Sequence, residues 1–174
     1  MNLPQPSGLC WCHNCRMRFL RTTVLVGILA LGAVLPGLSA ACSPATAAQA
    51  REMVERGADL VSSEGYKEAF TRFMDPVEGY VVGNLYLFAI DFKGNILANS
   101  IAPESIGGNA LYSQSPDGKF PVQEMIKTAL TWGDGWVQYE FLDPCTGRVS
   151  LKSSFVKRVG DVLLGAGYYG VTEA

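Results

Sequence analysis

The sequence predicts an α+β fold in which a long N-terminal helix packs on an antiparallel sheet of five strands. Apolar residues between positions 46 and 73 recur at spacings of three and four, which is the period of one helix face. From residue 85 onward, short apolar runs alternate with turns rich in glycine, asparagine and proline, a pattern typical of strands joined by hairpins. A length of 174 residues with 48% hydrophobic and 17% charged side chains suits one domain with a tail and excludes disorder along the whole chain.

The predicted helix has one apolar stripe and one expected break. Charged side chains fill the positions between the stripe residues, so the opposite face is expected to be solvated. Gly65 interrupts the pattern and predicts a kink or a division into two helices. Asp75-Pro76 ends the helix, because proline disfavours helical backbone in the residue before it. The stripe consists of Ala50, Met53, Val54, Gly57, Leu60, Val61, Phe70 and Phe73.

The rest of the domain is expected to contain five strands and one short helix. The run LYLFAI at residues 85–90 is apolar at every position, which predicts a central strand covered on both faces. A turn containing Gly94-Asn95 joins it to the second strand in a hairpin. Short turns separate the last three strands, which predicts an antiparallel meander. The other strands are expected at 96–98, 135–141, 149–159 and 162–168, and the short helix at 122–132.

The first forty residues predict a secretory signal peptide, because an uncharged apolar run at 24–35 follows basic residues and precedes small ones. As a helix this run would rise about 18 Å, short of a hydrocarbon core of about 30 Å, which favours a signal peptide over the alternative of a retained anchor. We expect signal peptide and small-residue linker at 1–47 and one domain at 48–174, with translation starting at Met17 as the preferred interpretation. The basic residues are Arg16, Arg18 and Arg21.

Three interpretations of the processing site remain open. Cleavage after Ala40 or Ala41 satisfies the small-residue rule, and so does cleavage after Ala47. Alternatively, Ser39-Ala40-Ala41-Cys42 resembles a bacterial lipobox in which Cys42 is lipidated, although serine stands where that motif usually has leucine. Cys145 offers Cys42 a disulfide partner in an oxidising compartment, which lipidation of Cys42 would exclude.

The composition of the predicted mature chain excludes several classes of function. The single histidine, His13, lies in the predicted signal segment, so nucleophilic catalysis through Ser–His or Cys–His pairs is not expected. No acidic metal-binding loop and no glycine-rich phosphate-binding motif occurs. From Cys42 onward the chain carries 11 basic and 16 acidic side chains, a net charge of −5 that does not suit nucleic-acid backbones. We therefore expect no enzymatic activity, no metal, no cofactor and no nucleic-acid partner.

Two residues of the predicted meander suit a small anionic ligand. If strands 135–141 and 149–159 pair around their turn, Tyr139 and Lys152 are neighbours across the ladder. An ammonium beside an aromatic hydroxyl suits a carboxylate, since charge selects the anion and the hydroxyl orients it. The alternative is a surface ion pair of Lys152 with Glu140 or Asp143. Trp136 also belongs to this strand, but strict alternation puts it opposite Tyr139 unless a bulge intervenes.

Five segments, in order, resemble the single Cache domain of the second type. They are LYLFAIDFKGNILAN at 85–99, ESIGGNAL at 104–111, SPDGK at 115–119, GWVQYEFLDPCTGR at 135–148 and KSSFVKRVGDVLLGAGYY at 152–169. Together with the N-terminal helix the resemblance spans about residues 50–169. It implies a PAS-like fold and an extracytoplasmic module that senses small molecules. Departures from the family pattern are Phe155 in place of tyrosine, Ala98-Asn99 in place of alanine–histidine, and Cys145, and the first two put the identity of the ligand in doubt.

The resemblance implies a ligand cavity between the sheet and the loop that carries Gly107-Gly108-Asn109. We expect a stand-alone domain, exported to the periplasm or anchored through Cys42 or an uncleaved signal segment, that binds an organic or amino acid. It is expected to signal through a membrane-bound receptor or histidine kinase and to form a homodimer through the N-terminal helix. The alternative is a structural or interaction module of the cell envelope without a ligand. The predicted ligand-binding residues are Lys152, Tyr139, Trp136, Asn109, Tyr86 and Phe88.

Overall fold

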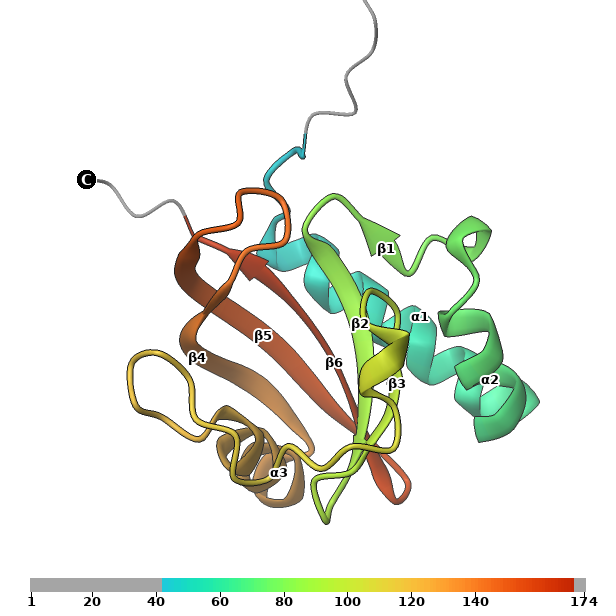
Figure 1. The fold of residues 1–174 in the computed structure, drawn as a ribbon. Helices are drawn as coiled ribbons and strands as arrows, with labels where there is room; N and C mark the ends of the chain where they lie inside the picture. Colours follow the sequence, from blue (N-terminus) through green and yellow to red (C-terminus); the bar gives the residue numbers. More distant parts are fainter. Residues whose placement is uncertain (1–41, 171–174) are drawn as a thin grey trace, which may run out of the picture. The chain divides into compact units, whose positions relative to one another are not determined.

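The structure is a computed structural model that describes residues 42–170 (Figure 1). The expectations for the signal peptide, its apolar run and the start at Met17 lie outside the described residues. Within residues 42–170, no helix is both long enough and apolar enough to cross a membrane.

Two consecutive helices form the N-terminal part of the domain, as the apolar stripe predicts. Helix α1 spans Ala47–Glu64, and α2 spans Tyr66–Phe73. Thr46 begins α1 with a capping box, in which its hydroxyl accepts from the Gln49 backbone while the Gln49 side chain accepts from the Thr46 backbone. Gly65 separates the helices with φ 81°, a left-handed value that favours glycine. The predicted division at this residue is confirmed.

The sheet is antiparallel throughout and contains six strands. Its order is β1-β2-β6-β5-β4, and β3 pairs with β2. The last strand along the chain, β6, therefore lies between the first hairpin and the two strands before it (Figure 1). The strands are β1 (Val81–Val82), β2 (Leu85–Asp91), β3 (Ile96–Asn99), β4 (Asp134–Leu142), β5 (Val149–Val159) and β6 (Val162–Tyr169). The five predicted strands are confirmed, and only the two-residue β1 was not expected.

Helices cover both faces of the sheet, and each face has its own hydrophobic core. Helices α1 and α2 pack on one face, and α3 (Pro121–Trp132) packs on the other. Alternate residues of β2 divide between the two cores: Leu85, Leu87 and Ala89 join the α1 side. Tyr86, Phe88 and Ile90 join the α3 side. This confirms that the uniformly apolar run is a strand covered on both faces.

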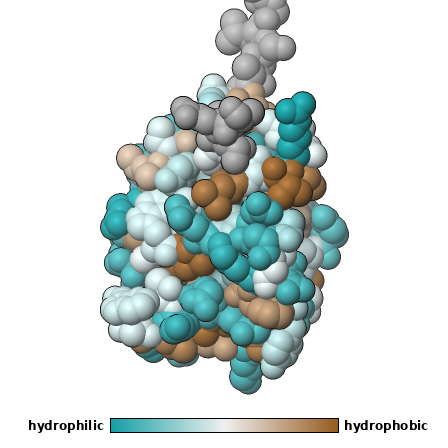
Figure 2. All heavy atoms as spheres, turned by 90° about the vertical axis from the view of Figure 1, so that its left-hand side faces the viewer, coloured by the Kyte–Doolittle hydropathy of each residue, from teal (hydrophilic) through white to brown (hydrophobic). Residues whose placement is uncertain are grey.

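The side of the molecule that carries the edge strand β4 has scattered apolar residues. Phe141 and Leu142 of β4 and Val149 and Leu151 of β5 are partly exposed. Figure 2, which views this side, shows separate brown patches among teal ones. On the part of this face that Figure 2 leaves uncovered, the apolar side chains thus form separate patches.

Replacing Leu87 with alanine should strongly destabilise the fold. Leu87 is 0% exposed in the core under α1, so Leu87→Ala should lower the free energy of unfolding by about 2–5 kcal/mol. Denaturant unfolding followed by circular dichroism measures the change. Val77→Ala is the control, since Val77 is 87% exposed, and it should change the stability by less than about 0.5 kcal/mol. Equal effects of the two variants would contradict this core.

Candidate ligand-binding site

A cavity of about 500 Å³ lies on the face of the sheet opposite α1. The sheet forms its floor, and α3 together with the segment from β3 to α3 forms its walls. A volume of this size is ordinary for a small-molecule site. The residues that line it include Tyr86, Phe88 and Ile90 of β2, Asn99, Ile101, Ser105 and Ala110 beyond β3, Val122 and Met125 of α3, Tyr139 and Phe141 of β4, and Lys152 of β5.

Lys152 is the only charged side chain that lines this cavity among the described residues. It is 1% exposed, and its Nζ donates a hydrogen bond of 2.7 Å to the Tyr86 hydroxyl. Aromatic rings surround the ammonium, with distances from Nζ to the ring centroids of 3.9 Å for Tyr86, 5.2 Å for Tyr169 and 5.3 Å for Phe141. These cation–π contacts replace part of the lost hydration.

Lys152 forms no ion pair with any residue between 42 and 170. The alternative of a surface pair with Glu140 or Asp143 is therefore wrong, because the side chain is buried and neither carboxylate reaches it. Burial lowers the pKa of Lys152 from 10.5 to about 7, and the charge of Asp143 opposes this shift. The charged and neutral forms are thus balanced near neutral pH.

Tyr139 lies opposite Lys152 in the β4–β5 ladder, which confirms the predicted neighbours. Its hydroxyl lies 3.1 Å from the buried Ser154 hydroxyl. Burial raises the pKa of Tyr139 and of Tyr86 above their ordinary value, so both phenols stay neutral. The cavity therefore combines one cationic group with neutral hydroxyls.

Two glycines of β6 make room for the site. A Cβ at Gly165 would overlap the Phe88 ring, and a Cβ at Gly167 would lie 2.6 Å from Cε of Lys152. Both positions face the cavity side of β6, since Leu163 two residues earlier belongs to the core on that side. The alternating glycines in LLGAGYY were a signal in the sequence that this face must stay open.

Trp136 does not line the cavity. The β4–β5 register runs unbroken from Asp134 to Leu142, so no bulge brings Trp136 to the face of Tyr139. Its ring packs instead against Phe155 and Tyr168 at centroid distances of 5.3 Å and 5.8 Å, on the α1 side, and is 38% exposed. The structure thus gives Trp136 a packing position.

Asn109 holds the loop in place and does not line the cavity. Its side-chain amide donates to the Lys93 carbonyl and to Oδ1 of Asn95, and its Oδ1 accepts from the Leu111 backbone. These bonds fasten the loop to the turn between β2 and β3, and the neighbouring Ala110 lines the cavity instead. The side-chain NH2 and oxygen of Asn109 thus both bond to the loop itself or to the neighbouring turn, and Asn109 has a structural position.

Several cavity residues were not among those predicted. Phe141 follows Tyr139 by two positions, so alternation along β4 would have found it. Asn99 was noted only as a departure from the family, yet it closes one wall. Its Oδ1 accepts from the backbones of Ile101 and Ala102, and its Nδ2 donates to the Ser105 hydroxyl. Met125 and Val122 come from α3 and carried no signal beyond helical periodicity.

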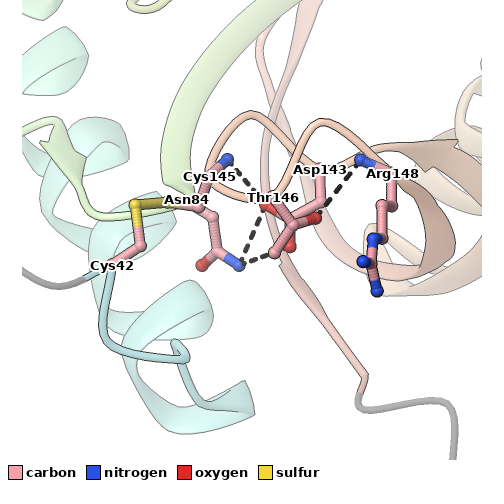
Figure 3. The surroundings of a disulfide bond; sticks show 6 residues. All are labelled: Cys42, Asn84, Asp143, Cys145, Thr146 and Arg148. Atoms are coloured by element: carbon pink, nitrogen blue, oxygen red, sulfur yellow. Dashed lines mark hydrogen bonds between the residues drawn. A yellow bond between two sulfur atoms is a disulfide. The ribbon is translucent and has the colours of Figure 1, made fainter.

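A disulfide fixes the rim of the cavity (Figure 3). Cys42, just before α1, is bonded to Cys145 in the β4–β5 turn, with their Cα atoms 5.7 Å apart. Pro144, next to Cys145, lines the cavity. Because its sulfur is used in this bond, Cys42 has no thiol for a lipid thioether, and the lipobox interpretation is incompatible with the structure.

Asp143 and Asn84 reinforce the same rim (Figure 3). The Asp143 carboxylate accepts from the Cys145 backbone at 2.9 Å, and Nδ2 of Asn84 approaches it at 3.4 Å. Asp143 thus turns toward the β1–β2 turn and is not among the cavity-lining residues. No group of three or more histidine, cysteine or acidic side chains within residues 42–170 is arranged to hold a metal ion.

Breaking the disulfide should destabilise the domain. The bond joins residues 103 positions apart, and removing a native disulfide from a small exported domain typically costs about 2–5 kcal/mol. Cys145→Ser should lower the free energy of unfolding by this amount in denaturant titrations under oxidising conditions. Cys42→Ser and the double variant should match it, because each removes the same bond. Two free thiols in the folded, oxidised wild-type protein would contradict the pairing.

Comparison with known proteins supports a family assignment. The sequence profile of Single Cache domain 2 matches residues 45–169. No curated protein matches the chain significantly.

Solved structures of similar fold include chemotaxis proteins and a chemosensory domain. A methyl-accepting chemotaxis protein from Vibrio parahaemolyticus has a TM-score of 0.61 at 19% identity, with 70% of this chain and 86% of that chain covered. A periplasmic sensor domain of a chemotaxis protein has 0.53 at 21%, covering 70% and 88%. A Cache chemosensory domain described for carboxylic acid recognition has 0.55 at 19%, covering 70% and 86%. Cache domains are extracellular or periplasmic, non-catalytic modules that bind ligands. The chain belongs to the Single Cache domain 2 family.

Proposed function

We propose that this chain is an exported sensor domain that binds a small carboxylate-bearing ligand beside Lys152. The observation that carries the proposal is a buried ammonium that faces a cavity of about 500 Å³ without a carboxylate partner among the described residues. Burying an unpaired charge is costly, so a ligand that brings the opposite charge to Lys152 offsets part of that cost and gains binding energy from it.

The neighbouring groups suit a carboxylate in particular. Nζ of Lys152 uses one of its three protons on the Tyr86 hydroxyl, which leaves donors for a second acceptor. An ammonium–carboxylate hydrogen bond is stronger than a neutral one, and the low polarity of the aromatic surroundings strengthens it further. A carboxylate at Nζ also holds the lysine in its charged form.

Export and signalling are supported by independent observations. The disulfide is typical of oxidising compartments outside the cytoplasm, and the basic, apolar and small-residue order before Cys42 is that of a signal peptide. Solved structures of the same fold come from chemotaxis proteins. We propose that ligand occupancy is passed to a membrane-bound receptor or histidine kinase, with the charged outer face of α1 as the surface for dimerisation or docking. The open cavity gives no support to the alternative of a ligand-free envelope module.

Removing the charge of Lys152 should weaken carboxylate binding. Isothermal titration calorimetry of the exported protein with propanoate, 4-methylpentanoate, butanedioate and leucine should find binding of at least one of them. Lys152→Met keeps much of the side-chain volume and should weaken that binding at least tenfold, since a buried charge-assisted bond is lost. Lys67→Met, an exposed lysine on α2, is the control and should bind as the wild type does. Wild-type affinity in Lys152→Met would refute the proposed site.

Carboxylate affinity should fall as the pH rises above neutrality. The folded-state pKa of Lys152 is about 7, so above this value the free protein loses the proton that the bound state needs. The dissociation constant should rise by up to about tenfold per pH unit there. Titrations in buffers of different ionisation enthalpy should detect proton uptake on binding. An affinity that stays constant from pH 6 to 9 would contradict this linkage.

The exported protein should retain Cys42. Cleavage after Ala40 or Ala41 keeps both partners of the disulfide, whereas cleavage after Ala47 would remove Cys42 and also the Thr46 cap of α1. Intact mass spectrometry of the secreted protein should find an unlipidated N-terminus at Ala41 or Cys42 and a mass lower by two hydrogens than that of the reduced chain. An N-terminus at Ala48 or a lipid adduct on Cys42 would contradict this.

A further inference from the structure

We infer that the ligand is a monocarboxylate with an extended apolar body, and that amino acids and dicarboxylates are excluded. This inference rests on the proposed function and narrows it. Its basis is the polarity of the cavity lining: among residues 42–170, Lys152 is the one charged lining residue, and most of the others are apolar.

The cavity offers one cationic group to a ligand. Lys152 is the single charged residue that lines the cavity within residues 42–170. Its Nζ bonds to the Tyr86 hydroxyl, and Tyr139 lies opposite it in the β4–β5 ladder; burial keeps both phenols neutral. The lining can therefore neutralise one carboxylate, and it offers no second cation.

The other lining residues carry no charged group that could pair with a second charge on the ligand. Their apolar members are Phe88, Ile90, Ile96, Ile101, Val122 and Met125. The polar residues Asn99 and Ser105 bond to each other and to the backbone of Ile101 and Ala102. Ser113 adds only a neutral hydroxyl. A second carboxylate or an ammonium buried against these walls would lose its hydration without gaining an ionic partner.

Asp143 is the acid whose charge acts on Lys152, and it is therefore the candidate partner for the ammonium of an amino acid. Its carboxylate is directed to the Cys145 backbone and to Nδ2 of Asn84 at the rim, as Figure 3 shows. Leu142 and Pro144 on either side of it line the cavity, whereas Asp143 does not. An α-ammonium bound beside Lys152 would therefore lack an acidic partner within the cavity.

The size of the cavity favours a body longer than that of a two-carbon acid. At about 30 Å³ for a water-sized group, 500 Å³ holds roughly sixteen such groups, whereas acetate has four heavy atoms. Each methylene buried against the apolar walls should raise affinity about fourfold, according to the usual transfer free energy. Affinity should therefore increase along a series of straight-chain acids until the cavity is filled.

Matched ligand pairs test the inference by calorimetry on the exported wild-type protein. Hexanoate should bind more tightly than propanoate and acetate. Leucine differs from 4-methylpentanoate by its α-ammonium, and hexanedioate differs from hexanoate by a second carboxylate. Leucine and hexanedioate should each bind at least tenfold more weakly than their partners. The alcohol 1-hexanol, which keeps the body and lacks the charge, should also bind at least tenfold more weakly than hexanoate.

The outcomes separate this inference from the proposed function. Tighter binding of leucine than of 4-methylpentanoate, lost in Asp143→Asn, would overturn the inference and leave a carboxylate site at Lys152. Tighter binding of hexanedioate than of hexanoate, or an affinity that falls from acetate to hexanoate, would also overturn only the inference. If no acid binds, or if hexanoate binds Lys152→Met and the wild type equally, the proposed function fails as well.

Discussion

The buried ammonium of Lys152 is the constraint on which the cavity side of this domain depends. A charge at this depth needs substitutes for water, and the Tyr86 hydroxyl together with four aromatic rings supplies part of them. The side chain also needs space, which Gly167 provides on the neighbouring strand. Because β6 is central in the sheet, the same strand that makes this space also joins the β2–β3 hairpin to β5 and β4. Strand β6 therefore serves both the fold and the site.

Much of the fold was predictable because its signals are local. The helical stripe, the break at Gly65 and the apolar run of β2 follow from spacing alone, and the structure confirms each of them. The pairing of Tyr139 with Lys152 also followed, since a short turn fixes the register of the two strands it joins. The short β1 was missed because two residues are too few to show a period.

The site was only partly predictable, since the use of a polar side chain depends on contacts between distant segments. Tyr86, Phe88, Tyr139 and Lys152 do line the cavity. Asn109 had the chemistry of a binding residue, but the turn at Lys93 and Asn95 uses its amide. Trp136 was an aromatic residue on the correct strand, and the unbroken register turned it to the other face. Conversely, Asn99 gained its place in the wall from bonds with the residues that follow it, which no spacing rule indicates.

The bond between Cys42 and Cys145 also bears on how the protein matures. The other cysteines, Cys10, Cys12 and Cys15, all precede residue 42. With the cleavage after Ala40 or Ala41 that we propose, two cysteines would remain, and a single intramolecular pairing would exist. A thiol oxidase is then sufficient for correct maturation, and a disulfide isomerase has no mispaired form of the monomer to repair. In an exported chain the pairing would also wait until β4 and Cys145 have been translocated, because the whole of the chain from α1 to β4 lies within the loop that it closes.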